Sequence, residues 1–133
     1  MGIKSDPSRW TDPRHLRGLE GERIAQRYLE ALGWRVMDHR FRMGRLEIDL
    51  IARKGGLVVF VEVKTRWSVG FGTPLEAVTD LKKREIVHVA QAWVDRHGRA
   101  EDVYRFDVIG VTLLGRGHHR IDHVEDAFRD GWR

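Results

Sequence analysis

Residues 47–66 read EIDLIARKGGLVVFVEVKTR, and this stretch decides the fold of the chain. The pair Gly55-Gly56 separates two short apolar segments by a distance that is typical of a β-hairpin. Strand side chains alternate between two faces, so residues 57, 59, 61 and 63 share one face and residues 58, 60, 62 and 64 share the other. Glu62 and Lys64 therefore end an otherwise apolar face of the second strand.

The first strand of this hairpin brings a third charged residue, Asp49, into the same region. The two-residue period predicts that Asp49 shares a face with Glu47 and Ile51, and that Ile48, Leu50 and Ala52 lie on the opposite face. If the register places Asp49 beside Glu62, two carboxylates converge next to a lysine, which suits a hard cation. Two like charges at this distance are costly without a metal ion.

A simpler interpretation of Glu62 and Lys64 is a solvated strand edge or a cross-strand ion pair. Two charges spaced two residues apart on one strand face commonly have no other role. The flanking composition argues against this, because a strand as apolar as residues 57–63 is expected to be central and covered on both faces.

Hydrophobic periodicity outside the hairpin predicts two helices and further strands. The expected elements are a helix at 18–32, strands at 34–39, 46–53 and 57–65, a helix at 75–96, strands at 104–114 and 120–124, and a final helical turn at 126–130. Gly33 is typical of a helix C-terminus and Pro74 of a first helical turn. The order α-β-β-β-α-β-β, with the first three strands as an antiparallel meander, predicts an α/β domain with a five-stranded mixed sheet flanked by helices.

Residues 1–17 carry two prolines and no apolar period, so we expect a flexible N-terminal leader followed by a single domain over residues 18–133. The 133-residue chain has 24 Lys and Arg against 20 Asp and Glu, a net charge of +4. The absence of cysteine excludes disulfides, thiolate zinc sites, iron–sulfur clusters and a cysteine nucleophile. The longest apolar run, at 57–61, is too short to cross a bilayer, and no signal peptide is recognisable, so we expect a cytoplasmic protein without membrane association.

Four segments carry a resemblance to a known family. They are Gly21-Glu22 at the start of a helix that also contains Ala25 and Tyr28-Leu29, then Gly33-Trp34, EIDLIA at 47–52 and VFVEVKTR at 59–66. Over about residues 18–112 the chain resembles the bacterial YraN family. Those proteins are similar to restriction-endonuclease-like nucleases of the PD-(D/E)XK superfamily, which includes archaeal Holliday-junction resolvases. The family usually has glycine before Glu-Ile-Asp, where this chain has Leu46.

The resemblance implies a catalytic site and a reaction. Asp49 matches the superfamily aspartate, Glu62 and Lys64 match its E-x-K strand, and Glu22 matches the glutamate that the first helix often supplies. These matches imply Mg²⁺- or Mn²⁺-dependent hydrolysis of phosphodiester bonds in DNA, including branched or recombination intermediates. Asp49 and Glu62, with the carbonyl of Val63, would bind one or two ions, and Glu22 would hold a water or a second ion. Lys64 would orient the nucleophile or stabilise charge on the phosphate.

Glu22 can also be judged from its helix position. It lies three and seven residues before Ala25 and Leu29, so it shares their side of the helix and is expected to point toward the sheet. A glutamate in a first helical turn is also favoured by the helix dipole alone. Both interpretations remain open at the level of sequence.

Several basic and aromatic residues are candidates for contacts with nucleic acid. They are Arg42, Arg45, Arg66, Trp67 and Lys82. Trp67 and Phe71 could stack on an unpaired base, and they could equally be core aromatics, just as arginines on hairpins are often ordinary surface.

Other patterns in the sequence resemble binding sites but are better explained by structure. The run at 115–120 begins like a dinucleotide fingerprint but lacks its third glycine and precedes a strand, so we interpret it as a hairpin turn. His118, His119, Asp122 and His123 form a weak transition-metal pattern that we leave out of the site, and we interpret Asp107 as structural. A non-catalytic nucleic-acid- or partner-binding module is the alternative to a nuclease, and a homodimer is suggested only by analogy with nucleases that cut two strands.

Overall fold

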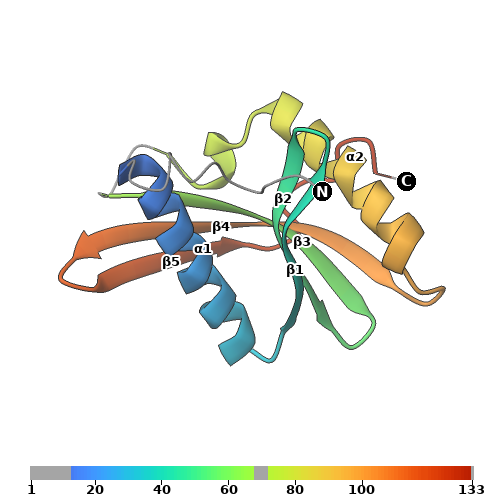
Figure 1. The fold of residues 1–133 in the computed structure, drawn as a ribbon, viewed down its shortest axis with the longest axis horizontal. Helices are drawn as coiled ribbons and strands as arrows, with labels where there is room; N and C mark the ends of the chain where they lie inside the picture. The colour runs from blue at the N-terminus through green and yellow to red at the C-terminus, as the bar shows by residue number, and fades with distance from the viewer. Residues whose placement is uncertain (1–12, 68–71, 133) are drawn as a thin grey trace.

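The computed structural model describes residues 13–67 and 72–132, and it contains the five-stranded mixed sheet and two flanking helices that the sequence predicted. The elements in chain order are α1 (Pro13–Ala31), β1 (Arg35–Met43), β2 (Leu46–Lys54), β3 (Leu57–Arg66), the short 3₁₀ helix η2 (Leu75–Ala77), α2 (Asp80–His97), β4 (Val103–Gly115) and β5 (His118–Val124). Figure 1 shows α1 and α2 crossing the sheet at separate places. In the described part of the chain, neither helix is long and apolar enough to cross a membrane.

The sheet has the strand order β1-β2-β3-β4-β5. The pairs β1–β2, β2–β3 and β4–β5 are antiparallel, and β3 and β4 are parallel. A parallel pair needs a crossover connection, which α2 and its flanking loops supply. The predicted antiparallel meander of the first three strands is confirmed.

The core is divided between the two faces of the sheet, as expected for a central strand. Val58 and Phe60 of β3 belong to a cluster that includes the buried side of α2. Val59 and Val61 belong to a second cluster that includes Ala25 of α1 and its neighbours. Both faces of β3 are therefore covered, and the charged end of this strand is the exception.

Several elements differ from the sequence prediction, among them β1, which continues to Met43 instead of ending at 39. Helix α1 begins five residues earlier, at Pro13, a residue that is well suited to a first helical turn. The predicted helix at 75–96 is divided into η2 and α2, because Val78 is extended (φ −99°, ψ 113°) and the side chain of Thr79 caps α2 by accepting a hydrogen bond from the backbone N–H of Lys82. The predicted helical turn at 126–130 is wrong, since Asp126 has a left-handed φ of 50° and no helix forms there.

Close packing of α1 on β3 fixes the position of the first helical turns. Gly21 is buried, and a Cβ atom at this position would overlap the hydroxyl of Thr65. Only glycine allows the helix backbone to approach the end of β3 so closely. The neighbouring Glu22 is thereby held near the charged end of β3.

Candidate functional site

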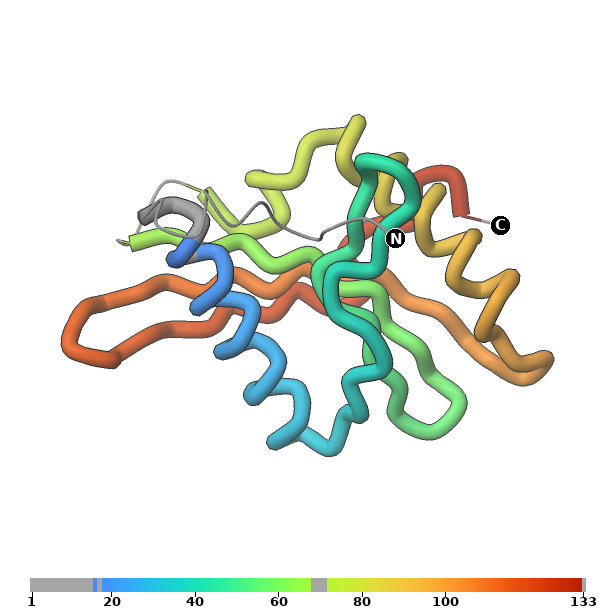
Figure 2. Tube along the Cα trace, in the orientation of Figure 1, coloured from blue at the N-terminus to red at the C-terminus, as the bar shows by residue number. Residues whose placement is uncertain are grey.

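The site begins at an irregularity in the β1–β2 hairpin. His39 pairs with Leu50 and Phe41 with Ile48, so Arg40 lies opposite Asp49. Arg40 has a left-handed φ of 55°, which is unusual for a residue other than glycine or asparagine. Figure 2 shows the hairpin curling out of the sheet, with its tip on the side of α2.

This irregularity overturns one part of the strand prediction. Strict alternation placed Ile48 on the same face as Leu50 and opposite Ile51. In the structure, Ile48 and Ile51 both lie in the cluster beneath α2, and Leu50 lies in the cluster beneath α1. The alternation breaks at Asp49 because the hairpin turns there, and the aspartate is left at the transition between the two faces.

Asp49 and Glu62 come together at the point where β2 and β3 separate. The last ladder pair is Leu50 with Val61, and Asp49 and Glu62 follow it on their respective strands. Asp49 Oδ2 accepts a hydrogen bond of 2.8 Å from the backbone N–H of Val63, and the two carboxyl groups lie close enough for the charge of Asp49 to raise the pKa of Glu62. The aspartate side chain thus takes over a backbone donor where the strand ladder ends.

Burial dominates the electrostatics of this carboxyl pair. Glu62 is only 5% exposed, and its Oε1 atom has no hydrogen-bond partner among the described residues. Burial, reinforced by the charge of Asp49, raises the pKa of Glu62 to about 8. Burial also raises the pKa of Asp49, against the lowering effect of the Val63 N–H. The chain itself therefore does not stabilise two ionised carboxylates at this position.

Two lysines lie near the pair. Lys64 Nζ is 3.6 Å from Glu62 Oε2, and about a third of the Lys64 side chain is exposed. Lys82, in the first turn of α2, is close enough for its charge to lower the pKa values of both Asp49 and Glu62. Of the basic residues predicted to contact nucleic acid, Lys82 is the one that the fold brings to the carboxylates.

Glu22 reaches the same region from α1 but has a partner of its own. Its Oε1 atom accepts a 3.0 Å hydrogen bond from Arg40 Nε, and both side chains are largely buried. Burial and the charge of Asp49 raise the pKa of Glu22 to about 7, although Arg40 lowers it. Sequence reasoning missed Arg40, because no pattern marks a left-handed arginine whose side chain turns toward the helix.

A two-carboxylate centre fits the chemistry of Mg²⁺ better than the predicted three-carboxylate one. Among the described residues, no three Asp, Glu or His side chains are grouped so as to hold a metal ion. Mg²⁺ is usually bound by one or two carboxylates and keeps several waters. Asp49 and Glu62, with the unpartnered Oε1 of Glu62, are such a donor set.

The remaining predicted contact residues lie farther from the carboxylates. Arg42 Nε donates a 2.9 Å hydrogen bond to Glu47 Oε2, and Arg45 is exposed in the β1–β2 turn. Arg66 Nη1 donates to the carbonyl of Gly72 at 3.2 Å.

The two predicted stacking residues follow β3. Trp67, directly after β3, is 49% exposed. Phe71 lies outside the described residues, so its predicted role in stacking stays a prediction.

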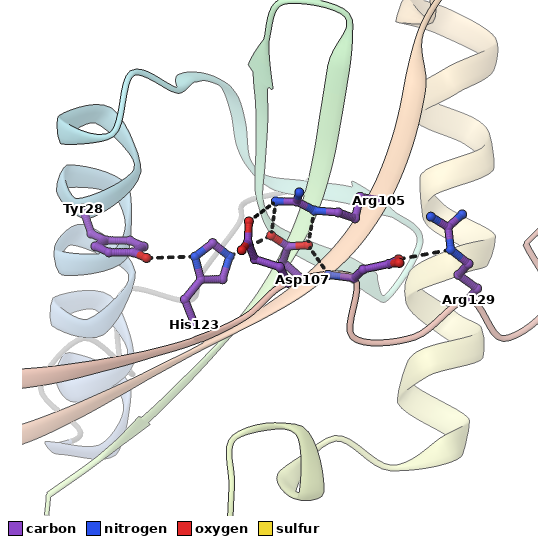
Figure 3. A network of polar contacts seen from close by, with 7 residues as sticks. Tyr28, Arg105, Asp107, His123 and Arg129 are labelled. Atoms are coloured by element: carbon purple, nitrogen blue, oxygen red, sulfur yellow. Dashed lines mark hydrogen bonds and ion pairs between the residues drawn. The ribbon is translucent and has the colours of Figure 1, made fainter.

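A second polar network lies between α1, β4 and β5, and Figure 3 shows it from close by. Asp107 is fully buried and receives hydrogen bonds from Arg105 Nε (2.8 Å) and Arg105 Nη2 (2.9 Å), and from the backbone N–H of Asp126 (3.0 Å). His123 Nε2 lies 2.7 Å from the carboxylate, and His123 Nδ1 lies 2.9 Å from the hydroxyl of Tyr28. These contacts join three elements through Asp107, as expected for a structural residue.

Comparison with known proteins agrees with the segments that carry the resemblance. The model of the uncharacterised protein family UPF0102 matches residues 21–111. A UPF0102 protein of Geobacter sulfurreducens is 46% identical over 111 residues, which cover 84% of this chain and 87% of the relative. UPF0102 proteins of Rhodococcus opacus (45% identity, 84% and 94% coverage) and Chlorobium phaeobacteroides (40% identity, 90% and 97% coverage) are also similar. The chain belongs to the UPF0102 family, which is the YraN family.

Proposed function

We propose that this protein is a metal-dependent nuclease that hydrolyses phosphodiester bonds in DNA. The observation that carries the proposal is the buried Asp49–Glu62 pair, whose raised pKa values and unpartnered Glu62 Oε1 leave a place for a cation. Carboxyl groups whose pKa values are raised by burial and a neighbouring carboxylate are common at functional sites. Branched DNA, which the resemblance to Holliday-junction resolvases suggests, is the substrate that we would test first.

Each residue of the site has a task in this reaction. Asp49, held in position by the Val63 N–H, and Glu62 supply the oxygen ligands for Mg²⁺ or Mn²⁺. The bound ion would lower the pKa of a coordinated water and neutralise charge that develops on the phosphate. Lys64, on the exposed end of β3, donates to the attacking water or to a phosphate oxygen. Lys82 adds a second positive charge on the side of α2.

The second candidate function is a nucleic-acid-binding module that does not cleave. One observation favours it. Arg40 forms an ion pair with Glu22, so the negative charge of this carboxylate is already balanced within the chain. A cleaving enzyme that needs Glu22 as a ligand has to displace Arg40. Homodimerisation and a cytoplasmic location stay predictions from the sequence.

A cleavage assay separates the two functions. Purified protein is incubated with supercoiled, single-stranded and branched DNA and with RNA, in Mg²⁺, Mn²⁺ or EDTA. We expect metal-dependent cleavage, and a loss of at least about a hundredfold in Asp49→Asn and Glu62→Gln, because the metal supplies several kcal/mol of transition-state stabilisation. Glu47→Gln is the matched control, since Glu47 lies on the same strand but pairs with Arg42.

The outcome decides between the candidates as follows. Binding of DNA without cleavage of any substrate would establish the binding module. Wild-type cleavage rates in both Asp49→Asn and Glu62→Gln would remove these carboxylates from the reaction.

A further inference from the structure

Two grooves follow α1 away from the candidate site. The first, of about 240 Å³, lies between α1 and β1 and is lined by residues that include Glu22, Arg23 and Arg40. The second, of about 450 Å³, lies between α1 and the β4–β5 hairpin and is lined by residues that include Arg23, Arg27 and His119. Leu19 and Arg23 line both grooves, so the two grooves meet across this stretch of α1.

Positive charge exceeds negative charge among the residues that line the second groove. Arg23 and Arg27 are one helical turn apart, so they lie on the same exposed side of α1. Neither has an ion-pair partner among the residues that the structure describes, and Glu20 is the one carboxylate among the described residues that line the second groove. The facing hairpin has no Asp or Glu between Val108 and Ile121, and its tip carries exposed Arg116 and His119.

We propose that these grooves bind the phosphate backbone of one nucleic-acid strand and lead it to the Asp49–Glu62 site. We name the surface formed by Arg23, Arg27 and His119 the α1 track. The inference rests on the proposed function, because it takes the carboxylate pair as the end of the path. Figure 2 shows the β4–β5 hairpin projecting beyond α1 at one end of the sheet, and Gly117 and His119 of this hairpin line the second groove.

The spacing of the arginines suits a short length of backbone. Four residues of α-helix rise about 6 Å. Phosphates of one strand of duplex DNA follow each other at about 3.4 Å along the duplex axis, so Arg23 and Arg27 span about two base-pair steps. Guanidinium groups bind phosphate oxygens through paired N–H donors, which makes arginine suited to such a track.

The test is the salt dependence of DNA binding in EDTA, where metal-dependent cleavage does not interfere. The track variant is Arg23→Gln/Arg27→Gln. The control is Arg35→Gln/Arg99→Gln, which removes the same charge from two exposed residues outside both grooves. Binding of fluorescent duplex and branched DNA is measured by anisotropy between low and moderate salt, and circular dichroism checks that each variant is folded.

We expect the track variant to reduce the slope of log Kd against log salt by about 1.8, at about 0.9 for each lost phosphate contact. The control should keep the wild-type slope. The single variant Arg27→Gln, at an exposed position, should reduce the slope by about 0.9 and serves if the double variant is unstable.

Two results would overturn the track: an unchanged slope in the track variants, or an equal reduction in the control. The proposed function is judged separately by cleavage. If wild-type protein cleaves DNA but the slopes are unchanged, the track is wrong and the nuclease stands. If the slopes fall as expected but no substrate is cleaved, the track stands as a binding surface and the nuclease is wrong.

Discussion

Two buried carboxylates on neighbouring strands have opposite surroundings. Asp107 on β4 is fully buried, and Glu62 on β3 is 5% exposed. Burial alone would raise the pKa of Asp107, but hydrogen bonds from His123, Arg105 and the Asp126 backbone hold it below its ordinary value. Glu62 faces another carboxyl group instead, and burial raises its pKa to about 8.

The difference separates a structural carboxylate from a candidate functional one. Burying a charge costs several kcal/mol unless donors within the protein replace the lost water. Asp107 finds those donors in its own chain, so its ionised form stabilises the fold. Lys64 and Lys82 lower the pKa of Glu62 too little to offset its burial, and we propose that a metal ion stabilises its ionised form.

The substitution Asp107→Asn tests the structural role of this carboxylate and has the largest expected effect. It removes the negative charge and leaves the partly buried Arg105 with the more exposed Glu125 as its ion-pair partner. We expect the free energy of unfolding to fall by about 3–5 kcal/mol, the usual cost of removing one partner of a buried ion pair. Urea denaturation at pH 7.5 in EDTA measures it.

Glu62→Gln is the matched substitution on β3. Because burial and the charge of Asp49 raise the pKa of Glu62 and so disfavour its ionised form in the folded protein, replacement by a neutral amide should leave stability unchanged or raise it. Equal losses in the two variants would show that the two carboxylates have the same structural role.

The pH dependence of stability tests the raised pKa of Glu62, and its expected effect is smaller. The folded-state pKa of Glu62, about 8, lies above its ordinary value of 4.5, so the folded state binds more protons between these values. Stability in EDTA should therefore fall as pH rises from about 5 to 8, by up to about 1.4 kcal/mol per pH unit. Chemical denaturation at several pH values measures the slope.

The control for this slope is again Glu62→Gln, which removes the titrating group. The variant should have a flatter profile than the wild type over the same pH range. Superimposable profiles would mean that Glu62 is not the group responsible.

The sequence predicted the centre of the site because local rules determine it. The glycine turn at 55–56 fixes the hairpin register up to the pair Leu50–Val61, and Asp49 and Glu62 are the next residues on the two strands. The covered β3 strand and the order of elements followed from hydrophobic periodicity. Lys82 was predicted as a contact for nucleic acid, and the fold brings it near both carboxylates.

The remaining features depend on contacts that no local pattern encodes. Arg40 reaches Glu22 only because of its left-handed backbone, and the same turn moves Ile48 to the other face of the sheet. The contact between Tyr28 and His123 joins residues 95 positions apart. Such partners become visible only when the helices are packed on the sheet.

Calorimetric titration with Mn²⁺ at pH 8 tests the central claim most directly, because it measures cation binding by Asp49 and Glu62 without reference to any substrate. We expect one saturable Mn²⁺ site in the wild-type protein. Binding should be weaker at pH 6, because protons compete with Mn²⁺ for the same oxygens, and absent in both Asp49→Asn and Glu62→Gln. A wild-type protein that takes up no Mn²⁺, or variants that bind it as the wild type does, would contradict cation binding by Asp49 and Glu62.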